Sequence, residues 1–394
     1  MILPPLVAFL FVALSSARPA SYAIWAADSA IARRQGNGLD ANGNAIVSYE
    51  HGEFQLGLRQ LFERTGNQTY FDYIRAGVDN IVYNNGTVHG AYSVSEYVLD
   101  PLRTGPTMLY LFEQTSAQKY KAAADIFRKQ LDSHPRTGEG QFWHKLKYPN
   151  QGWLDGVYMG SIFYADYTRT FEPTNLTAWD DITLQFTLMY KNTVQNSTVA
   201  NSTGLLYHGY DYSHKTVWAS SDRGHSPEVW DRALGWYSMA LVDALEILPQ
   251  SHPGYQQILD ILHTLVPKII AAADPTSGVW WLVITQPNRD KNYFESSGSS
   301  MFVYSLLKAV RLGLVEDDDG KIVAVAKKAY EYITANWVIT NADGTMNWIN
   351  TVVVGSLDTT GDFNYYVSQS KNLNDLKGLA AFVLASLEIE RLEA

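Results

Sequence analysis

Carboxylates, tryptophans and cations recur at six places in this chain, each at the start of a segment with helical periodicity. Indole faces suit the C–H faces of sugar rings, and the planar fork of Arg232 suits a carboxylate. Helix N-termini add N–H groups and a positive dipole end, which favour an anionic ligand. The pattern therefore indicates a site for an anionic sugar. The clusters span 49–51, 100–105, 153–156, 229–236, the region around Glu295, and 371–378.

Each of these residues also has a purely structural interpretation. An acid at a helix start is often a cap, and Asp100 directly precedes Pro101, which is a common cap arrangement. Tryptophan most often packs in a core, which is the alternative for Trp153, Trp230 and Trp236. For Arg232 the alternative is an ion pair with Asp231 or another acid. Capping does not require tryptophan, so the recurrence of the clusters favours a site.

An internal repeat predicts the elements that must position these clusters. The decapeptide LFERTGNQTY at 61–70 is followed fifty residues later by LFEQTSAQKY at 111–120, with six of ten positions identical. Each reads as a helix end, a short turn and a new helix start, and such a period marks stacked helical hairpins. Periodicity predicts twelve helices, at roughly 20–34, 49–64, 68–83, 102–116, 118–132, 154–170, 175–193, 230–247, 253–273, 295–312, 319–335 and 373–392.

Twelve helices form six hairpins, so the sequence predicts an all-α fold, a closed (α/α)6 barrel. Alternate helices are rich in small and apolar residues and form the predicted inner ring, while their partners carry more Lys, Asp and Gln. Inner helices of such a barrel run the same way, so the six clusters should share one mouth. Two β-prone stretches, near Val279 and Thr345, are expected as rim hairpins or loops. No linker divides the chain, so 21–394 is predicted to be one catalytic domain.

Composition and motifs exclude several classes of function. The chain has 394 residues, 46% hydrophobic and 18% charged, and a net charge of −10, which argues against a nucleic-acid partner. Motifs of zinc proteases, P-loop proteins and serine hydrolases are absent. His208 and His214 lie six residues apart without an acidic third ligand, so no metal site is predicted.

The first twenty residues read as a secretory signal peptide. An apolar run at 2–14 is followed by small residues, and it is too short to span a membrane. Asparagines in glycosylation sequons support a secreted, extracellular glycoprotein, and no cysteine is present to test the compartment. The sequons are at Asn67, Asn85, Asn175, Asn196 and Asn201.

Over nearly the whole mature chain, the sequence resembles glycoside hydrolase family 105, the unsaturated rhamnogalacturonyl hydrolases, and more distantly family 88. The resemblance is carried by FWHKLKYPNQGWLDGVYMG, LLYHGYD, VWDRALGWYSMALVDALEILP, FESSGSSMFVYSLL and NDLKGLAAFVLA. It implies an (α/α)6 barrel, with Asp155 as general acid/base and Asp100 as a second essential carboxylate. The residues that it implies as lining the substrate pocket are Tyr49, Lys145, Met159, His208, Trp230, Arg232 and Trp236. Asp231 stands where the family pattern leads us to expect a small residue.

The resemblance also implies a reaction that needs no cofactor. Asp155, protonated, would hydrate the C4–C5 double bond of a 4,5-unsaturated uronic acid at the non-reducing end of an oligosaccharide left by a lyase. We expect Asp100 and a desolvated, Trp-lined pocket to raise the pKa of Asp155 so that it holds this proton.

Alternative functions differ in substrate or in class. The expected substrate is unsaturated galacturonyl-rhamnose from rhamnogalacturonan I, with ulvan or arabinogalactan fragments as alternatives. A hydrolase of saturated sugars, a lyase using Tyr49 or His208 as base, and a non-catalytic sugar-binding protein are further candidates. We expect a monomer without a membrane partner.

Overall fold

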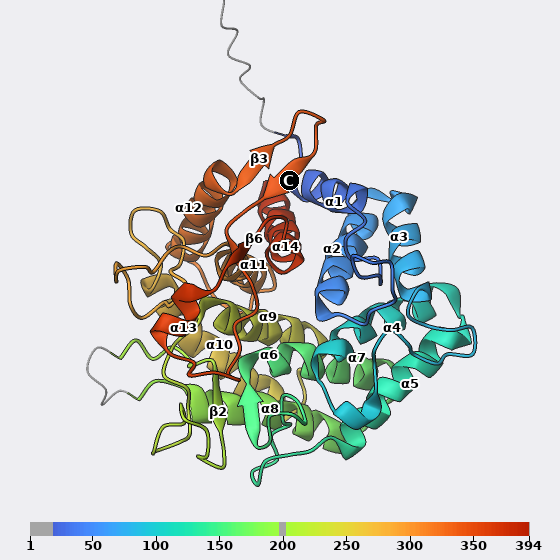
Figure 1. Cartoon of the computed structure of the whole chain (residues 1–394), viewed down its shortest axis with the longest axis horizontal. Helices are drawn as coiled ribbons and strands as arrows, with labels where there is room; N and C mark the ends of the chain where they lie inside the picture. The colour runs from blue at the N-terminus through green and yellow to red at the C-terminus, as the bar shows by residue number, and fades with distance from the viewer. Residues whose placement is uncertain (1–18, 197–201, 394) are drawn as a thin grey trace, which may run out of the picture.

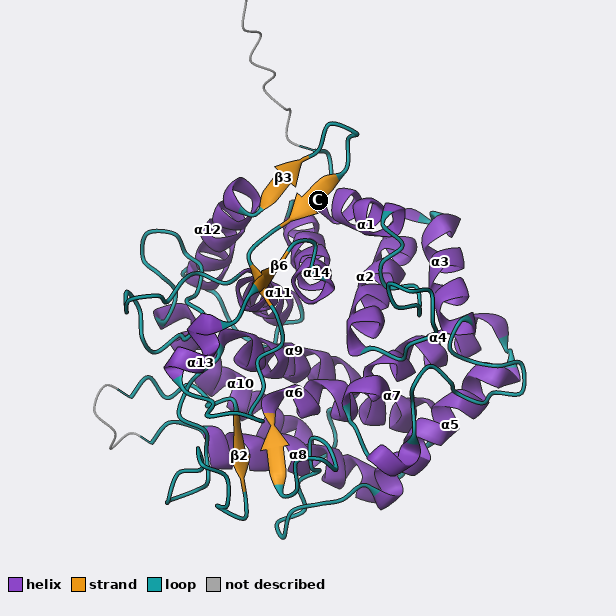
Figure 2. Cartoon of the chain, viewed as in Figure 1, coloured by secondary structure: helices purple, strands orange, loops and turns teal. Residues whose placement is uncertain are grey.

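The computed structural model describes residues 19–196 and 202–393, and within them helices form a double ring (Figures 1 and 2). In Figure 1, α3, α5, α8 and α12 lie at the periphery, whereas α2, α11 and α14 lie toward the centre. This arrangement is the predicted barrel of helical hairpins. The outer helices are α1 (Tyr22–Ala32), α3 (Gln68–Asp79), α5 (Gln118–Ser133), α8 (Leu176–Thr193), α10 (Pro253–Ala271) and α12 (Lys321–Asn336).

The inner ring follows the predicted alternation. Its helices are α2 (Tyr49–Thr65), α4 (Gly105–Thr115), the continuous run α6 (Leu154–Gly156), η3 (Val157–Ser161) and α7 (Ile162–Phe171), then α9 (Asp231–Ile247), α11 (Ser296–Arg311) and α14 (Leu376–Leu392). Every residue of α9 from Asp231 to Leu245 is buried, as is every residue of α14 from Leu376 to Ile389. Outer α5 buries only six residues along one face. A helix that is apolar all round belongs in a core, which explains why these segments form the inner ring.

The repeated decapeptides form the predicted corners. LFERTGNQTY joins α2 to α3, and LFEQTSAQKY joins α4 to α5. Both first helices end on a residue in the left-handed region, Gly66 with φ 67° and Ser116 with φ 57°. Such a C-cap lets the backbone reverse within two residues, so the repeat encodes the same corner twice.

The chain ends meet and close the ring. The Ser21 hydroxyl donates to the Glu390 carboxylate at 2.9 Å, and the backbone N–H of Ala23 donates to the same carboxylate at 3.1 Å. These bonds join the start of α1 to the end of α14, which lie side by side in Figure 1.

Side-chain contacts confirm that inner helix N-termini share one mouth. Lys377 at the start of α14 pairs with Glu50 at the start of α2 at 3.2 Å. Arg232 at the start of α9 pairs with Glu295, the N-cap of α11, at 3.3 Å. These contacts join four of the six clusters in two pairs, 371–378 with 49–51 and 229–236 with the region around Glu295.

The remaining elements are short. The 3-10 helices are η1 (Val94–Glu96) and η2 (Asp100–Thr104), and a six-residue helix, α13 (Phe363–Ser368), contacts His208 through Tyr366. Antiparallel pairs join β1 (Gln151–Trp153) to β2 (Gly209–Asp211), β3 (Val338–Thr340) to β4 (Met346–Trp348), and β5 (Thr351–Val352) to β6 (Lys371–Asn372). The β-prone stretch near Thr345 therefore forms strands as expected.

Two further segments follow the predictions. The stretch near Val279 is a loop that makes only isolated bridges, such as Trp281 with Phe294, and most of its side chains are buried. The predicted helix at 154–170 forms and contains the π-helical turn η3, a feature that is frequent at functional sites.

Residues 1–18 of the predicted signal peptide lie outside the described residues, as does Asn201. Of the other sequon asparagines, Asn67, Asn85 and Asn196 are exposed, and Asn175 is half-buried. Across residues 19–196 and 202–393, no helix has the length and apolar character needed to cross a membrane.

Candidate active site

Asp155 lies at the mouth of the barrel, where strand β1 turns directly into α6. Its side chain is 15% exposed, and its Oδ2 lies 3.0 Å from Nε2 of the fully buried His208. His208 comes from the residue before β2, which pairs with β1. The small sheet thus fixes the carboxylate and the imidazole against each other.

Asp100 lies at the start of η2 and forms the second polar centre. Its Oδ2 contacts Nζ of Lys145 at 2.6 Å, and its Oδ1 lies 3.5 Å from Nε2 of His144. The charges of Asp100 and Asp155 both act on His144 and on Lys145, so the two carboxylates flank this pair of residues. The predicted acids are therefore neighbours in one site.

The pKa of Asp155 differs from our expectation. Burial alone would raise it, but the charge and hydrogen bond of His208, with a further contribution from His144, hold the pKa below its ordinary value. Asp100 is not among the main causes of this shift, and its own close partner is Lys145. The expectation of a raised pKa is thus wrong, since the nearest partner of Asp155 is a base and not a second acid.

His144 was missed in the sequence and belongs to the site. Its ring stacks on Trp153 with centroids 4.4 Å apart, and it is buried. Burial lowers its pKa to about 4, so it is neutral near pH 7. The signal was present, because His144 adjoins Lys145 within the motif FWHKLKYPNQGWLDGVYMG.

The three tryptophans lie in the walls of the site but are covered. Trp153, Trp230 and Trp236 are 4%, 1% and 1% exposed. Trp236 stacks on Tyr158 at 5.1 Å and meets the edge of Tyr49 at 6.1 Å. Core packing is therefore the interpretation that the structure favours for these indoles, because so little of each face is free for a sugar.

The guanidinium of Arg232 donates its hydrogen bonds to acceptors within the protein. Its guanidinium donates to the Ser297 hydroxyl at 2.7 Å, to Glu295 at 3.3 Å and to the backbone carbonyls of Val352 and Val353. The competing acid is therefore Glu295, whereas Asp231 bonds the backbone N–H of Arg232 at 2.8 Å. These contacts tie α9 to α11 and β5, and they do not support a carboxylate clamp at Arg232.

Asp231 is accommodated by a glycine. A Cβ on Gly298 would lie 2.4 Å from Oδ2 of Asp231, so only glycine at this place in α11 leaves room for the acid. Burial and the charge of Glu295 raise the pKa of Asp231 well above its ordinary value.

Met159 and Tyr49 complete the predicted set. Met159 is buried in the π-helical turn η3, about one turn after Asp155 in the same helical run. Tyr49 is half-buried at the start of α2, and with Asp100 it lines a pocket of about 250 Å³. A second pocket of about 960 Å³, lined in part by Glu50, His51 and Lys377, lies beside it.

Comparisons with known proteins assign the family. A sequence model described as Glycosyl Hydrolase Family 88 matches residues 25–393. A solved family 105 glycoside hydrolase from C. acetobutylicum ATCC 824 is 39% identical, with a TM-score of 0.87 over 94% of this chain and 99% of that one. The chain belongs to the family 88/105 glycoside hydrolases.

Two curated relatives of this family 88/105 hydrolase are more distant. Protein Atu3128 of Agrobacterium fabrum is 31% identical over 58% of this chain and 97% of its own. The unsaturated rhamnogalacturonyl hydrolase YesR of Bacillus subtilis is 24% identical over 65% of this chain and 69% of its own. The all-α barrel, the hydrolase class and the resemblance to families 105 and 88 are thus confirmed.

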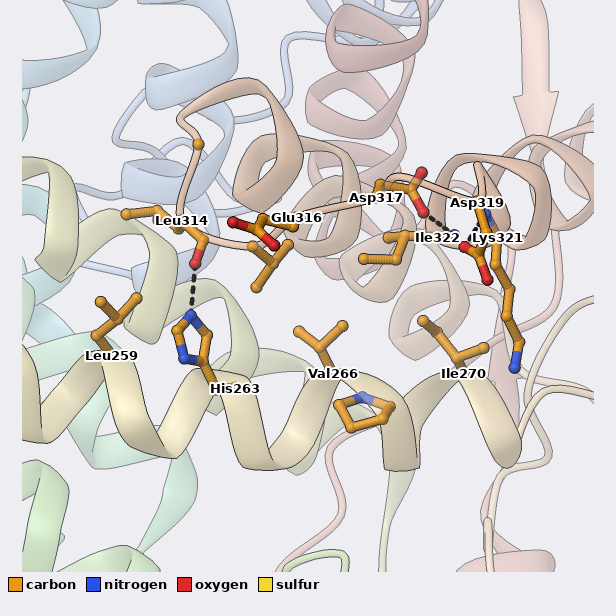
Figure 3. Close-up of a pocket in the computed structure, with 13 residues that line it drawn as sticks. Leu259, His263, Val266, Ile270, Leu314, Glu316, Asp317, Asp319, Lys321 and Ile322 are labelled. Atoms are coloured by element: carbon orange, nitrogen blue, oxygen red, sulfur yellow. Dashed lines mark hydrogen bonds between the residues drawn. The ribbon is translucent and has the colours of Figure 1, made fainter.

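A pocket on the outside of the family 88/105 barrel holds none of the predicted residues. It has a volume of about 640 Å³ between α10 and the loop that precedes α12 (Figure 3). Val266, Ile270 and Ile322 line it, and His263 bonds the Leu314 carbonyl across it at 2.7 Å. Glu316, Asp317, Asp319 and Lys321 also line it, but Asp317 and Asp319 accept hydrogen bonds from the backbone N–H groups of Ile322 and Lys321 at the start of α12. Within the described residues, no group of His, Cys, Asp and Glu is arranged to hold a metal ion.

Proposed function

We propose that this protein removes the 4,5-unsaturated uronic acid from the non-reducing end of oligosaccharides produced by lyases. Its preferred substrate is unsaturated galacturonyl-rhamnose from rhamnogalacturonan I. The observation that carries the proposal is the pairing of Asp155 with His208 beside the Asp100–Lys145 pair. The first pair can hold and move a proton, and the second can bind sugar hydroxyls and an anion.

The reaction begins with a proton delivered from Oδ2 of Asp155 to C4 of the unsaturated ring. The electron pair of the double bond forms the C4–H bond, and positive charge develops at C5, stabilised by the ring oxygen. A water molecule adds at C5 and gives a proton back to the Asp155 carboxylate. Asp155 therefore ends the hydration step protonated, as it began.

The product of hydration is a hemiketal at C5, and its ring opens spontaneously, without catalysis by the protein. The bond from C5 to the ring oxygen breaks, leaving a ketone at C5 and a hemiacetal at C1. The hemiacetal then expels the aglycone as an alcohol. Because C1 is never attacked directly, the separation of the two carboxylates does not determine a stereochemical outcome.

Lys145 is the cation that we assign to the uronate carboxylate. Its side chain is 27% exposed, and the charges of both Asp100 and Asp155 raise its pKa. The guanidinium of Arg232, in contrast, is buried and already pairs with Glu295. Asp100 would hold Lys145 in place and accept hydrogen bonds from sugar hydroxyls. The choice of a rhamnose aglycone is supported by the name of the relative YesR.

The test is an ultraviolet assay that follows loss of the conjugated double bond in lyase-generated pectic oligosaccharides. We expect wild-type protein to remove the signal and Asp155→Asn to lower kcat by at least about 100-fold, the usual contribution of a positioned acid. Asp180→Asn is the matched control, because the Asp180 side chain is 75% exposed on outer helix α8. Wild-type turnover by a normally folded Asp155→Asn would refute the assignment.

Substrate panels separate the alternatives. Activity on ulvan or arabinogalactan fragments but not on pectic ones would make the enzyme an unsaturated glucuronyl hydrolase. Binding of all of them without turnover would indicate a non-catalytic sugar-binding protein.

We also propose that the protein is secreted and glycosylated, on the basis of the apolar leader and the sequons. Expression of the full chain in a eukaryotic secretory host should give medium-borne protein whose mass falls after glycan removal. Retention of an unmodified full-length chain inside the cell would contradict this.

A further inference from the structure

A line of hydrogen bonds runs from Asp155 into the protein and ends at a tyrosine. Nε2 of His208 lies 3.0 Å from Oδ2 of Asp155, and Nδ1 of the same ring lies 2.7 Å from the hydroxyl of Tyr366. His208 and Tyr366 are 0% and 1% exposed, so bulk water does not set their protonation. Only the Asp155 end of this line reaches the mouth of the barrel.

The hydrogen bond between Tyr366 and Nδ1 determines which ring nitrogen of His208 carries the proton. Which ring nitrogen carries the proton is set by the partner of the other nitrogen, and a phenol can either donate or accept. If Tyr366 accepts from Nδ1–H, Nε2 is free to exchange a proton with Asp155. If Tyr366 donates to Nδ1, Nε2–H can only donate, and Asp155 is held as a carboxylate.

We propose that Tyr366 is a positioning residue that keeps a proton on Nδ1 of His208, so that Nε2 passes a second proton to and from Asp155. In the transfer, the Nε2–H bond of the imidazolium breaks and an O–H bond forms at Oδ2 of Asp155. The pair changes from carboxylate and imidazolium to carboxylic acid and neutral imidazole, with no net proton gained or lost. This inference rests on the proposed function, because it supplies the proton which that reaction needs.

Titratable groups lie at both ends of the line. Asp155 faces His208, and Glu228 and Asp362 act electrostatically on Tyr366. Burial raises the pKa of Glu228 to about 7, so Glu228 is not a fixed negative charge near neutral pH. His144, the other titratable ring near His208, has its pKa lowered to about 4 by burial and so carries no competing charge near pH 7.

Helix α13 holds the hydroxyl in place. The ring of Tyr366 stacks on Trp230 with centroids 5.6 Å apart and planes 26° apart. The Asp362 side chain caps the helix by accepting from the N–H of Tyr365 at 2.9 Å. The guanidinium of Arg289 lies 3.6 Å from the ring centroid of Phe363. The phenol therefore approaches Nδ1 from a fixed direction.

The experiment compares two neighbouring tyrosines. Tyr366→Phe keeps the stacked ring and removes only the hydroxyl that contacts His208. Tyr365→Phe removes a hydroxyl from the same helix, one that accepts from the backbone N–H of Ser356 at 2.8 Å and not from His208. The first readout is the 15N NMR spectrum of the histidines in the full chain, with His208 assigned through a His208→Gln variant.

We expect wild type and Tyr365→Phe to show a protonated Nδ1 at His208, and Tyr366→Phe to shift toward the Nε2–H tautomer. With substrate, Tyr366→Phe should lower kcat by up to about 10-fold, with a smaller change in KM, which is the effect of losing one neutral hydrogen bond. The basic limb of its kcat–pH profile should move to lower pH, because the imidazolium loses an acceptor.

Two results would overturn the inference: an unchanged His208 tautomer in Tyr366→Phe, or the same tautomer shift in Tyr365→Phe. The NMR readout needs no substrate. A tautomer shift in a protein that hydrolyses no unsaturated oligosaccharide would therefore refute the proposed function and leave the tautomer assignment standing.

Discussion

At the scale of single residues, the function of this barrel depends on which charges are paired and which are free. Asp100 pairs with Lys145, Asp155 pairs with His208, and Arg232 pairs with Glu295. Of the cations in these pairs, Lys145 is partly exposed, whereas Arg232 is buried. The side chain that can meet a substrate carboxylate is thus the lysine.

Replacing Lys145 by methionine should therefore weaken substrate binding. A charge-assisted hydrogen bond is worth about 1.5–3 kcal/mol, so we expect KM to rise about 10- to 100-fold with a smaller effect on kcat. Steady-state kinetics on the unsaturated disaccharide measures this. Lys147→Met is the control, since that side chain is 68% exposed and pairs with Asp358. Equal effects of the two variants would argue for a general charge effect.

Glu228 makes stability depend on pH. Burial raises its pKa from 4.5 to about 7, so between these values the folded chain keeps a proton that the unfolded chain releases. The free energy of unfolding therefore falls as pH rises through this window and stays lower above it. Glu228→Gln cannot ionise and should gain about 1–3 kcal/mol at pH 8 but little at pH 4.5.

Thermal melts at the two pH values test the role of Glu228. Glu331→Gln, on an exposed face of outer helix α12, is the control and should melt like wild type at both. A stabilisation by Glu228→Gln that is the same at pH 4.5 and pH 8 would show that ionisation is not its cause.

At the scale of elements, buried ion pairs fix the helices that carry the site. Arg103 of η2 pairs with Glu53 of α2 at 3.0 Å, and both side chains are buried. Tyr158 of η3 donates to the same carboxylate at 2.8 Å. Three elements that carry Tyr49, Asp100 and Met159 thus meet at one carboxylate below the mouth.

Breaking this contact should destabilise the fold strongly. Glu53→Ala leaves the Arg103 guanidinium buried without its partner, which typically costs about 3–5 kcal/mol. The double variant with Arg103→Met should lose less than the sum of the two single variants. Urea denaturation of the four proteins gives the coupling energy. The exposed pair Arg75–Asp72 is the control, and Asp72→Ala should cost less than about 1 kcal/mol. A strictly additive result at Glu53 and Arg103 would contradict the structure.

At the scale of the whole molecule, the inner ring is assembled from the entire chain. Helix α14 packs between α2 and α11, so the last helix contacts the second, and α1 is bonded to the end of α14. No segment of the ring can bury its apolar faces without its neighbours on both sides. Within residues 19–196 and 202–393, one large core cluster includes residues of every inner helix, and the second cluster is limited to Tyr148, Trp153, Trp218 and Leu357.

Residues 21–394 should therefore unfold in one cooperative transition. We expect a single calorimetric peak whose measured enthalpy matches the van't Hoff enthalpy, as for a two-state unit. A second peak, or a protease-resistant fragment that retains half of the helices, would show that the barrel divides into domains.

The sequence by itself determined the helices, their pairing and the family. Periodicity marks α2, α5 and α14 to within a few residues, because local burial patterns and caps decide helix existence. The repeated corner and the continuous apolar runs determine the hairpins and the inner ring. The motif around Asp155 and Lys145 brought the two acids into one predicted site, where the structure also places them.

Only the tertiary structure decided the electrostatics of that site. A pKa depends on the partners within a few ångströms, and those partners come from distant parts of the chain: His208 for Asp155, Glu295 for Arg232. Tyr366 has no local signal in the sequence, since its role arises from a contact across 158 residues. The exposure of the tryptophans was likewise undetermined, because the same indole can line a pocket or fill a core until its neighbours are placed.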